Sequence, residues 1–234
     1  MCCRYTLTKS IKEIEKRFQA EFATEAISWQ PTFNGAPTQA LPVITNTEPR
    51  EIQCFHFGLV PSKSETGSPD KGISLFNARA ETLLEKPTFK HLIQSQRCLI
   101  LTDGYLEFQK KGKLKQPYWI KQSENGDAPL FAMAGIWDWW TGENGEGFGS
   151  FSIITITPSP EIAWVHDRMP LVLSEEQENK WLTTPVTDAS LLVNAIQSHK
   201  ISLFPMAISA SANDTKNNHA GILQPQPVQL SLFE

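Results

Sequence analysis

The chain has 234 residues, of which 40% are hydrophobic and 20% charged, and its formal net charge at pH 7 is −4. This balance is typical of a globular protein, which we expect to form one domain, and the acidic net charge argues against a protein that coats nucleic acid non-specifically. Because no apolar run is long enough to span a bilayer and no secretory signal opens the chain, the sequence predicts a cytoplasmic protein without membrane association.

The first feature along the chain is Cys2, which would become the N-terminal residue if Met1 were removed. Its thiol and α-amine would then form a 1,2-aminothiol. The amine, with a pKa of roughly 7.7 to 8.0, can attack an aldehyde, and the thiol can close the imine into a thiazolidine. A cysteine near a chain end is also often only a small residue of an edge segment. The four cysteines lack CxxC spacing, so they favour neither disulfides nor a metal site.

Periodicity then predicts the regular elements. Residues 10–22 read as an amphipathic helix with Ser10 as N-cap and Glu13 completing a capping box. Residues 29–42 are rich in Pro, Asn and Gly and predict an ordered loop, and residues 61–72 predict an exposed one. Strands are predicted at residues 41–45, 51–59, 97–101, 118–120, 130–140 and 151–157. Further helices are predicted at residues 174–182, with Ser174 at the cap and Gln177 completing a capping box, and at residues 189–198.

Three polar side chains stand close together after an apolar run at residues 74–82. If this stretch is extended, Asn77, Arg79 and Glu81 share one face. Arg79 would then suit phosphate binding, and the Asn77 amide can donate and accept hydrogen bonds at once. A surface ion-pair cluster at the start of a helix explains the same residues equally well.

Two titratable residues, Glu107 and His166, are candidates for proton transfer. Glu107 falls among aromatic and apolar residues after a buried strand, where burial would raise its pKa and suit acid–base catalysis, although a solvent-facing glutamate is the commoner case. Lys110, Lys111, Lys113 and Lys115 surround Gly112 at a predicted hairpin turn and are explained either by phosphate contacts or by simple solvation. His166 titrates near neutral pH, although a lone histidine is more often structural.

The chain contains four short motifs in a fixed order: Cys2 after Met1, Asn77-Ala78-Arg79-Ala80-Glu81-Thr82, Asp103-Gly104-Tyr105-Leu106-Glu107, and His166-Asp167-Arg168-Met169-Pro170. Together they resemble the SRAP family, the SOS-response-associated peptidases that shield abasic sites in single-stranded DNA. The resemblance implies a single α+β domain over residues 1–223, in which a curved, mainly antiparallel sheet forms a partly open barrel with packed helices.

The resemblance also implies roles for individual residues. The α-amine and thiol of Cys2 form a thiazolidine with the ring-opened sugar, Glu107 handles protons, His166 assists sugar-ring opening and reversal, and Asn77 orients the sugar or phosphate. Flanking phosphates would be held by Arg4, Arg79 and Arg168. No cofactor or metal is implied, and we expect a monomer.

The chain departs from the family pattern at three places. Cys3 replaces the usual Gly after the nucleophile, Ser62-Lys63-Ser64 replaces a loop that usually carries tryptophan, and Phe108 replaces the usual Trp. Base stacking is worth roughly 1 to 3 kcal/mol, so the loss in the 62–64 loop predicts weaker or more salt-dependent binding, with Lys63 as a substitute phosphate contact.

The C-terminal residues 224–234 are predicted to lie outside the catalytic domain. Residues 224–228 read as a stiff, Pro-rich linker, and Gln229-Leu230-Ser231-Leu232-Phe233 resembles the bacterial sliding-clamp-binding pentapeptide, in which Gln229, Leu230, Leu232 and Phe233 make the contacts. A final core strand is the alternative for these residues.

The leading hypothesis is covalent capture of abasic sites in single-stranded DNA at replication forks. The alternatives are a thiol peptidase or autopeptidase with Cys2 as nucleophile and His166 as base, and a non-catalytic single-strand DNA-binding module. An abasic-site lyase activity is a further expectation from the resemblance.

Overall fold

The computed structural model describes residues 2–65, 75–112, 114–124, 127–184 and 201–226. At its centre five strands form a ring in the order β11, β10, β7, β4, β5. The ring is antiparallel except where it closes, because β11 pairs in parallel with β5 through Ser150↔His56 and Phe151↔Phe57. The ring strands are β4 (Ala40–Thr45), β5 (Glu51–Phe57), β7 (Arg97–Thr102), β10 (Phe131–Thr141) and β11 (Gly147–Ile156).

Closure of the ring depends on two aromatic side chains of β5. Phe57 stacks on Phe151 with ring centroids 5.2 Å apart. Phe55 lies against the backbone of Gly149, where an added Cβ would be 2.4 Å from its ring. The predicted α+β fold is confirmed, and the barrel that the sequence led us to expect as partly open is closed by this short parallel pairing.

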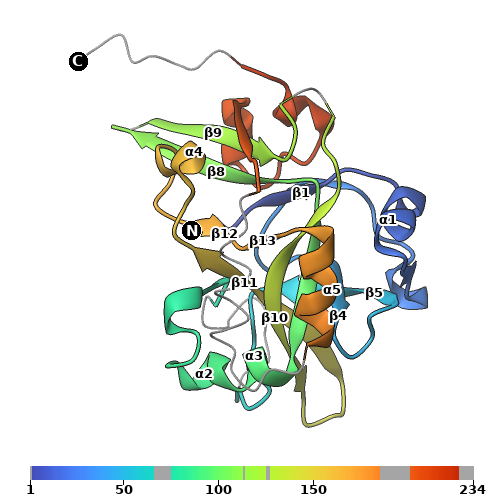
Figure 1. Ribbon diagram of the computed structural model, residues 1–234. Coiled ribbons are helices and arrows are strands. Elements are labelled where there is room, and N and C mark those ends of the chain that lie inside the picture. The colour runs from blue at the N-terminus through green and yellow to red at the C-terminus, as the bar shows by residue number, and fades with distance from the viewer. Residues whose placement is uncertain (1, 66–74, 113, 125–126, 185–200, 227–234) are drawn as a thin grey trace.

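β7 is buried along its whole length and β4 from Leu41 onward, as expected for an apolar run that is covered on both faces. Cys98 and Ile100 of β7 point into the barrel interior, whereas Leu99 and Leu101 belong to an outer core under the helices. α5 (Glu175–Thr183) crosses this outer face in Figure 1. Its fully buried Trp181 donates a 3.0 Å hydrogen bond from Nε1 to the Cys98 carbonyl.

A second sheet of five strands, in the order β14, β9, β8, β1, β3, packs beside the ring and carries the N-terminal end of the described chain (Figure 1). Gly104 at the start of β8 lies under Trp119, so closely that a Cβ there would be 2.1 Å from the indole nitrogen. The strands are β1 (Tyr5–Leu7), β3 (Thr32–Gly35), β8 (Gly104–Lys111), β9 (Leu114–Lys121) and β14 (Phe204–Ala207).

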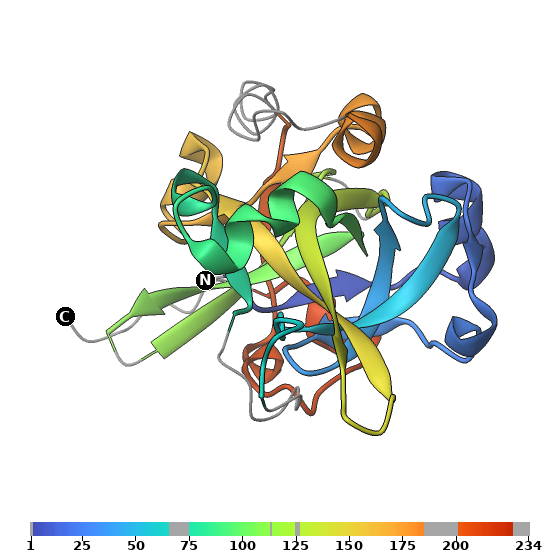
Figure 2. The same ribbon diagram turned by 90° about the horizontal axis from the view of Figure 1, so that it is seen from below.

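Shorter elements complete the fold around the two sheets, and Figure 2 shows them from below. Within the described residues, no helix is long and apolar enough to cross a membrane. The remaining elements are α1 (Ile11–Phe18), β2 (Glu21–Phe22), η1 (Thr24–Ala26), β6 (Asn77–Arg79), η2 (Ala80–Thr82), α2 (Pro87–Lys90), α3 (Leu92–Ser95), α4 (Pro160–Ala163), β12 (Met169–Pro170), β13 (Val172–Leu173), η3 (Ala210–Asn213) and η4 (Ala220–Leu223).

The structure corrects three predicted elements. The helix expected over residues 10–22 ends at Phe18, because Gln19 adopts a left-handed conformation with φ of 52° and β2 follows. The loop expected over residues 29–42 contains β3, which pairs with β1. Glu81 does not share a strand face with Asn77 and Arg79, since β6 ends at Arg79 and η2 begins at Ala80.

Both predicted capping boxes are confirmed, at Ser10 with Glu13 and at Ser174 with Gln177. The helix predicted at residues 189–198 lies outside the described residues, as do most of the 61–72 loop and the pentapeptide 229–233. The beginning of the predicted linker runs beside β14, where Gln226 N–H donates a 3.0 Å hydrogen bond to the Ala207 carbonyl.

Candidate active site at the N-terminal strand

Cys2 lies at the edge of β8, where the chain enters the second sheet. The Leu106 amide donates to the Arg4 carbonyl at 2.9 Å, so residues 2–4 continue alongside β8 toward Glu107. Cys2 is fully buried in the interior core, and the Asn77 side chain donates a 2.9 Å hydrogen bond from Nδ2 to its carbonyl. Burial, assisted by the negative charge of Glu107, raises the pKa of the Cys2 thiol well above its usual range. The thiol is therefore protonated at neutral pH.

Glu107 is buried among apolar neighbours, as the sequence predicted. Only 1% of its surface is exposed, and its Oε1 atom has no hydrogen-bond partner. It lies directly opposite Tyr118 across the β8–β9 hairpin, so both side chains share one face. Burial raises the pKa of Glu107 to about 7. A carboxyl with this pKa is present in both protonation states at neutral pH and can both donate and accept a proton.

His166 follows α4 in a short turn that two neighbours hold in place. Its Nδ1 atom lies 3.1 Å from the Arg168 amide nitrogen and 2.9 Å from Oδ1 of Asp167. Because the Asp167 side chain is exposed, burial of the imidazole has the larger effect and lowers the pKa of His166. The ring is therefore mainly neutral at pH 7 and is able to take up a proton.

Glu107 and His166 meet at a cavity of about 310 Å³ at this edge of the second sheet. Cys2 and Asn77 are not among its lining residues and are joined to each other by their hydrogen bond. The structure thus places the four residues that the sequence singled out in one region, with Cys2 itself fully buried. The cavity is lined by Cys3, Arg4, Glu107, Phe108, Lys110, Lys115, His166 and Asn213.

The four cations predicted to contact phosphates differ in their availability. Arg4 lines the cavity but donates from Nη1 to Oδ1 of Asn34 at 2.9 Å. Arg168 forms a two-fold ion pair with Glu81, with both N–O distances 2.8 Å, and also donates to the Thr155 carbonyl. The ion-pair alternative considered for Glu81 is therefore what the structure contains. Arg79 and Lys63 are exposed.

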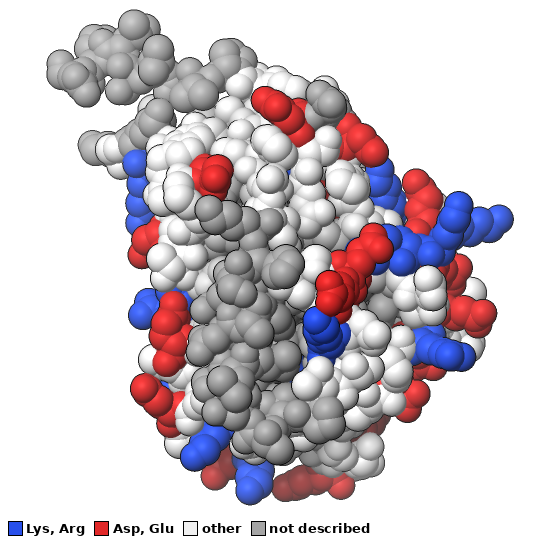
Figure 3. Space-filling model, in the orientation of Figure 1, with Lys and Arg blue, Asp and Glu red and all other residues white. Residues whose placement is uncertain are grey.

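Basic and acidic side chains are interspersed on the face of the molecule that Figure 3 shows. Among the described residues of this face, neither sign of charge is concentrated, in keeping with the net charge of −4.

Sequence reasoning did not assign the opposite wall of the cavity. Lys110 and Lys115 are paired across the β8–β9 hairpin and both line the cavity. The lysines of the predicted hairpin turn could therefore have indicated this wall from the sequence. Asn213 at the end of η3 is held by donating to the carbonyls of Lys115 and Ala210. Nothing local in the sequence marks Asn213, because its place depends on how η3 packs against β9.

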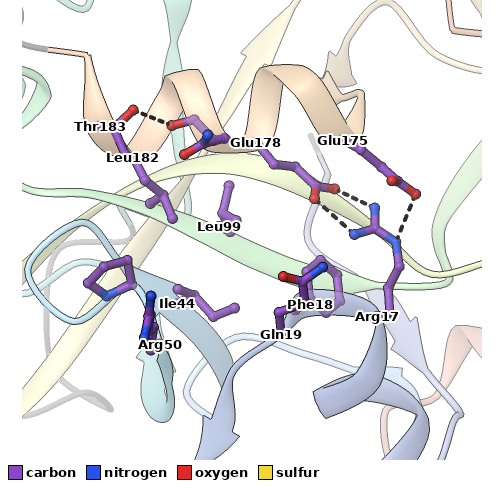
Figure 4. A pocket seen from close by; sticks show the side chains of 12 residues that line it. Arg17, Phe18, Gln19, Ile44, Arg50, Leu99, Glu175, Glu178, Leu182 and Thr183 are labelled. Atoms are coloured by element: carbon purple, nitrogen blue, oxygen red, sulfur yellow. Dashed lines mark hydrogen bonds and ion pairs between the residues drawn. The ribbon is translucent and has the colours of Figure 1, made fainter.

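A second cavity, of about 530 Å³, lies between α1, α5 and the outer face of β4 and β7 (Figure 4). Its floor is apolar, from Ile44, Leu99 and Leu182, and one side is closed by the ion pair between Arg17 and Glu178. None of the residues predicted to act chemically lines it. Within the described part of the chain, no group of three or more His, Cys, Asp or Glu side chains is placed to hold a metal ion.

Comparison with known proteins places this arrangement in a wider group. The sequence model of the family described as SOS response associated peptidase (SRAP) matches residues 1–213. Abasic site processing protein YoqW of Bacillus subtilis is 31% identical over 227 residues, which cover 96% of this chain and 99% of YoqW. Abasic site processing protein HMCES of Xenopus tropicalis is 31% identical over 220 residues, 81% of this chain and 64% of HMCES. A crystal structure of a protein from Bacteroides thetaiotaomicron matches with a TM-score of 0.82 and 26% identity, covering 97% of this chain and all of that one.

Proposed function

Because the chain belongs to the SRAP family of SOS response associated peptidases, we propose that it processes abasic sites in DNA, and that it does so by covalent capture in single-stranded DNA. The observation that carries this proposal is Glu107, a buried carboxyl with a pKa of about 7 beside the N-terminal Cys2. Capture of an aldehyde by an amine needs a proton donor and a proton acceptor at neutral pH, and this group supplies both.

The proposed reaction begins with removal of Met1, which leaves Cys2 with a free α-amine. His166 takes the proton of the anomeric hydroxyl and returns it to the ring oxygen as the bond between that oxygen and the anomeric carbon breaks, which gives the aldehyde. The amine then adds to the aldehyde carbon, and one amine proton passes to the former aldehyde oxygen. Glu107 protonates the resulting hydroxyl, water leaves, and the Glu107 carboxylate takes the remaining amine proton to give an imine. The thiol adds to the imine carbon and its proton passes to the imine nitrogen, which closes a thiazolidine, so that one C–N and one C–S bond form and the aldehyde oxygen departs as water. Asn77, which donates to the Cys2 carbonyl, orients the nucleophile.

The test of this function is a denaturing gel. The purified protein is incubated with a single-stranded oligonucleotide that carries one abasic site, and a band of reduced mobility that survives denaturation is expected. The same oligonucleotide with an intact base should give no such band. Absence of the shifted band from the mature protein would contradict covalent capture.

A thiol peptidase is less well supported by this site. Such an enzyme needs a thiolate, whereas burial and the Glu107 charge both raise the pKa of the Cys2 thiol. Capture of an aldehyde places a smaller demand on the thiol, since the α-amine makes the first attack. The non-catalytic DNA-binding alternative is separated from both by the gel.

We also propose that Arg79 binds a phosphate of the strand. Arg79 is exposed at the end of β6, two residues from Asn77, whereas Arg168 is already paired with Glu81. We expect Arg79→Ala to weaken binding of every single-stranded sequence to a similar extent and to reduce the slope of log K against log salt by about 0.7. Titrations of two unrelated oligonucleotides at several salt concentrations measure this. A loss confined to one sequence would indicate base recognition instead.

The C-terminal pentapeptide is proposed to tether the protein to the bacterial sliding clamp, which would bring Cys2 to replication forks. Leu232 and Phe233 would fill an apolar pocket of the clamp while Gln229 hydrogen-bonds at its rim. Deletion of residues 229–234 is expected to abolish clamp pull-down and to leave the cross-linking of a free oligonucleotide unchanged. A truncated protein that fails to fold or to cross-link would show that the segment belongs to the core.

A further inference from the structure

Trp164 is an unusually exposed aromatic residue beside the candidate active site. It follows α4 and precedes His166 by two residues, and 50% of its surface is in solvent. Among the described tryptophans only Trp139 is comparably exposed, at 47%. Since single exposed aromatic residues are common on protein surfaces, it is the position of Trp164 beside the candidate active site, and not its exposure alone, that indicates a ligand contact.

The indole is held firmly by the β8–β9 hairpin. Its ring meets that of Tyr118 at 87°, with centroids 5.0 Å apart. The Trp164 carbonyl accepts a 2.9 Å hydrogen bond from Nε2 of Gln109. The hydrogen bond positions the Trp164 backbone, and the contact with Tyr118 restrains the indole, which reduces the conformational freedom lost when it binds a planar partner.

These contacts also fix where the indole lies. Tyr118 is the cross-strand partner of Glu107, and Gln109 is two residues further along β8, so all three side chains project from the same face of the hairpin. Trp164 packs on that face, and His166, two residues later, lines the cavity with Glu107. The exposed indole is therefore close to the cavity without lining it, on the hairpin face of Glu107, whereas Lys110, which lines the cavity, projects from the other face of β8.

We propose that Trp164 stacks on a base adjacent to the abasic nucleotide, on the strand that enters the cavity. This inference rests on the proposed function and adds a base-binding residue to it. Single-strand binding combines cations that track the backbone with aromatic rings on which bases stack, in a way that tolerates any sequence. Lys110 and Lys115 supply cations at this cavity, and Trp164 supplies an aromatic ring close to it. An abasic nucleotide has no base of its own, so stacking of its neighbour is the means of holding the strand in place.

The test compares Trp164→Ala with Trp139→Ala, a control that removes an equally exposed tryptophan from β10. The β10–β11 turn lies at the opposite end of the molecule from the β8–β9 turn (Figure 1). Affinity is measured with an undamaged single-stranded oligonucleotide at several salt concentrations, so that the result does not depend on covalent chemistry. We expect Trp164→Ala to weaken binding by at least about five-fold without changing the salt slope, and Trp164→Phe to restore most of the affinity. Trp139→Ala should bind like the unaltered protein.

The possible outcomes are distinct. Equal affinities of Trp164→Ala and Trp139→Ala, or a reduced salt slope in Trp164→Ala, would overturn the stacking proposal while leaving covalent capture intact. Normal stacking behaviour with no cross-link to abasic DNA would overturn covalent capture alone. An unaltered protein that does not bind single-stranded DNA would overturn both. Thermal unfolding of each variant shows whether a loss of affinity follows from a loss of fold.

Discussion

Replacing Cys2 with alanine is expected to abolish the denaturation-resistant cross-link to abasic DNA. The variant retains an N-terminal amine after Met1 is removed, so it can still form an imine, but it has no thiol to close the ring. Borohydride should therefore recover a cross-link from Cys2→Ala by reducing the imine, whereas the unaltered protein needs no reductant. The substitution removes a single heavy atom from the interior core, which costs on the order of 1 kcal/mol of unfolding free energy and leaves the fold intact.

Cys3→Ala is the matched control, since it removes the neighbouring thiol, which lines the cavity but carries no α-amine. It should retain most of the cross-link. Equal loss in the two variants would contradict the assignment of the nucleophile to Cys2. Mass spectrometry of the active protein should show Met1 absent, and an N-terminal extension that blocks its removal should be as damaging as Cys2→Ala.

Where the sequence predicted the fold well, the signal was local. β7 contains a continuous apolar run because both of its faces are buried, and the predicted strand at residues 97–101 matches it closely. The capping boxes at Ser10 and Ser174 are read directly from residues three positions apart. The burial of Glu107 followed from its aromatic and apolar neighbours in β8.

The errors arose where distant contacts override local pattern. The helix expected to reach residue 22 ends at Phe18, because Gln19, a residue with no intrinsic preference for a left-handed conformation, adopts one, while Phe22 continues the helical apolar spacing. β3 contains Asn34 and Gly35, which are typical turn residues. It is a strand because it pairs with β1 and because the Asn34 side chain donates to the carbonyls of Ala212, Asp214 and Asn217, 178 to 183 positions away.

The candidate site also combines residues that the sequence could predict with an arrangement that it could not. The sequence predicted four chemically distinctive residues. Only the structure shows that Cys2 is buried while Glu107 and His166 line a cavity. Arg168 and Glu81 were each considered alone, as a phosphate ligand and as part of a polar face. They are partners in one ion pair across 87 positions of the chain. Complementary charges so far apart give no sequence signal without an alignment.

Glu107→Gln is expected to slow cross-linking by roughly 100-fold or more while leaving the affinity for undamaged single-stranded DNA nearly unchanged, because positioned acid–base groups typically contribute 10² to 10⁴ in rate. The replacement keeps the shape of the side chain and removes only its ability to exchange a proton. A parallel loss of affinity and rate would show that Glu107 acts in binding. Glu178→Gln is the matched control, since Glu178 is also a buried glutamate whose pKa burial raises, but it lies in the second cavity, paired with Arg17. It should cross-link at the normal rate.

The pH dependence of the cross-linking rate tests the acid–base role of Glu107 more directly than a rate measured at a single pH. Because burial raises the pKa of Glu107 to about 7, its protonated form, which delivers the proton that allows water to leave, declines as pH rises through 7. The α-amine becomes nucleophilic over nearly the same range, with a pKa of roughly 7.7 to 8.0. The two effects oppose each other, so the unaltered protein should show a maximum in single-turnover rate between these values. In Glu107→Gln the falling limb should disappear and the rate should rise to a plateau as the amine loses its proton. A variant that retained the falling limb would place the acid on another residue.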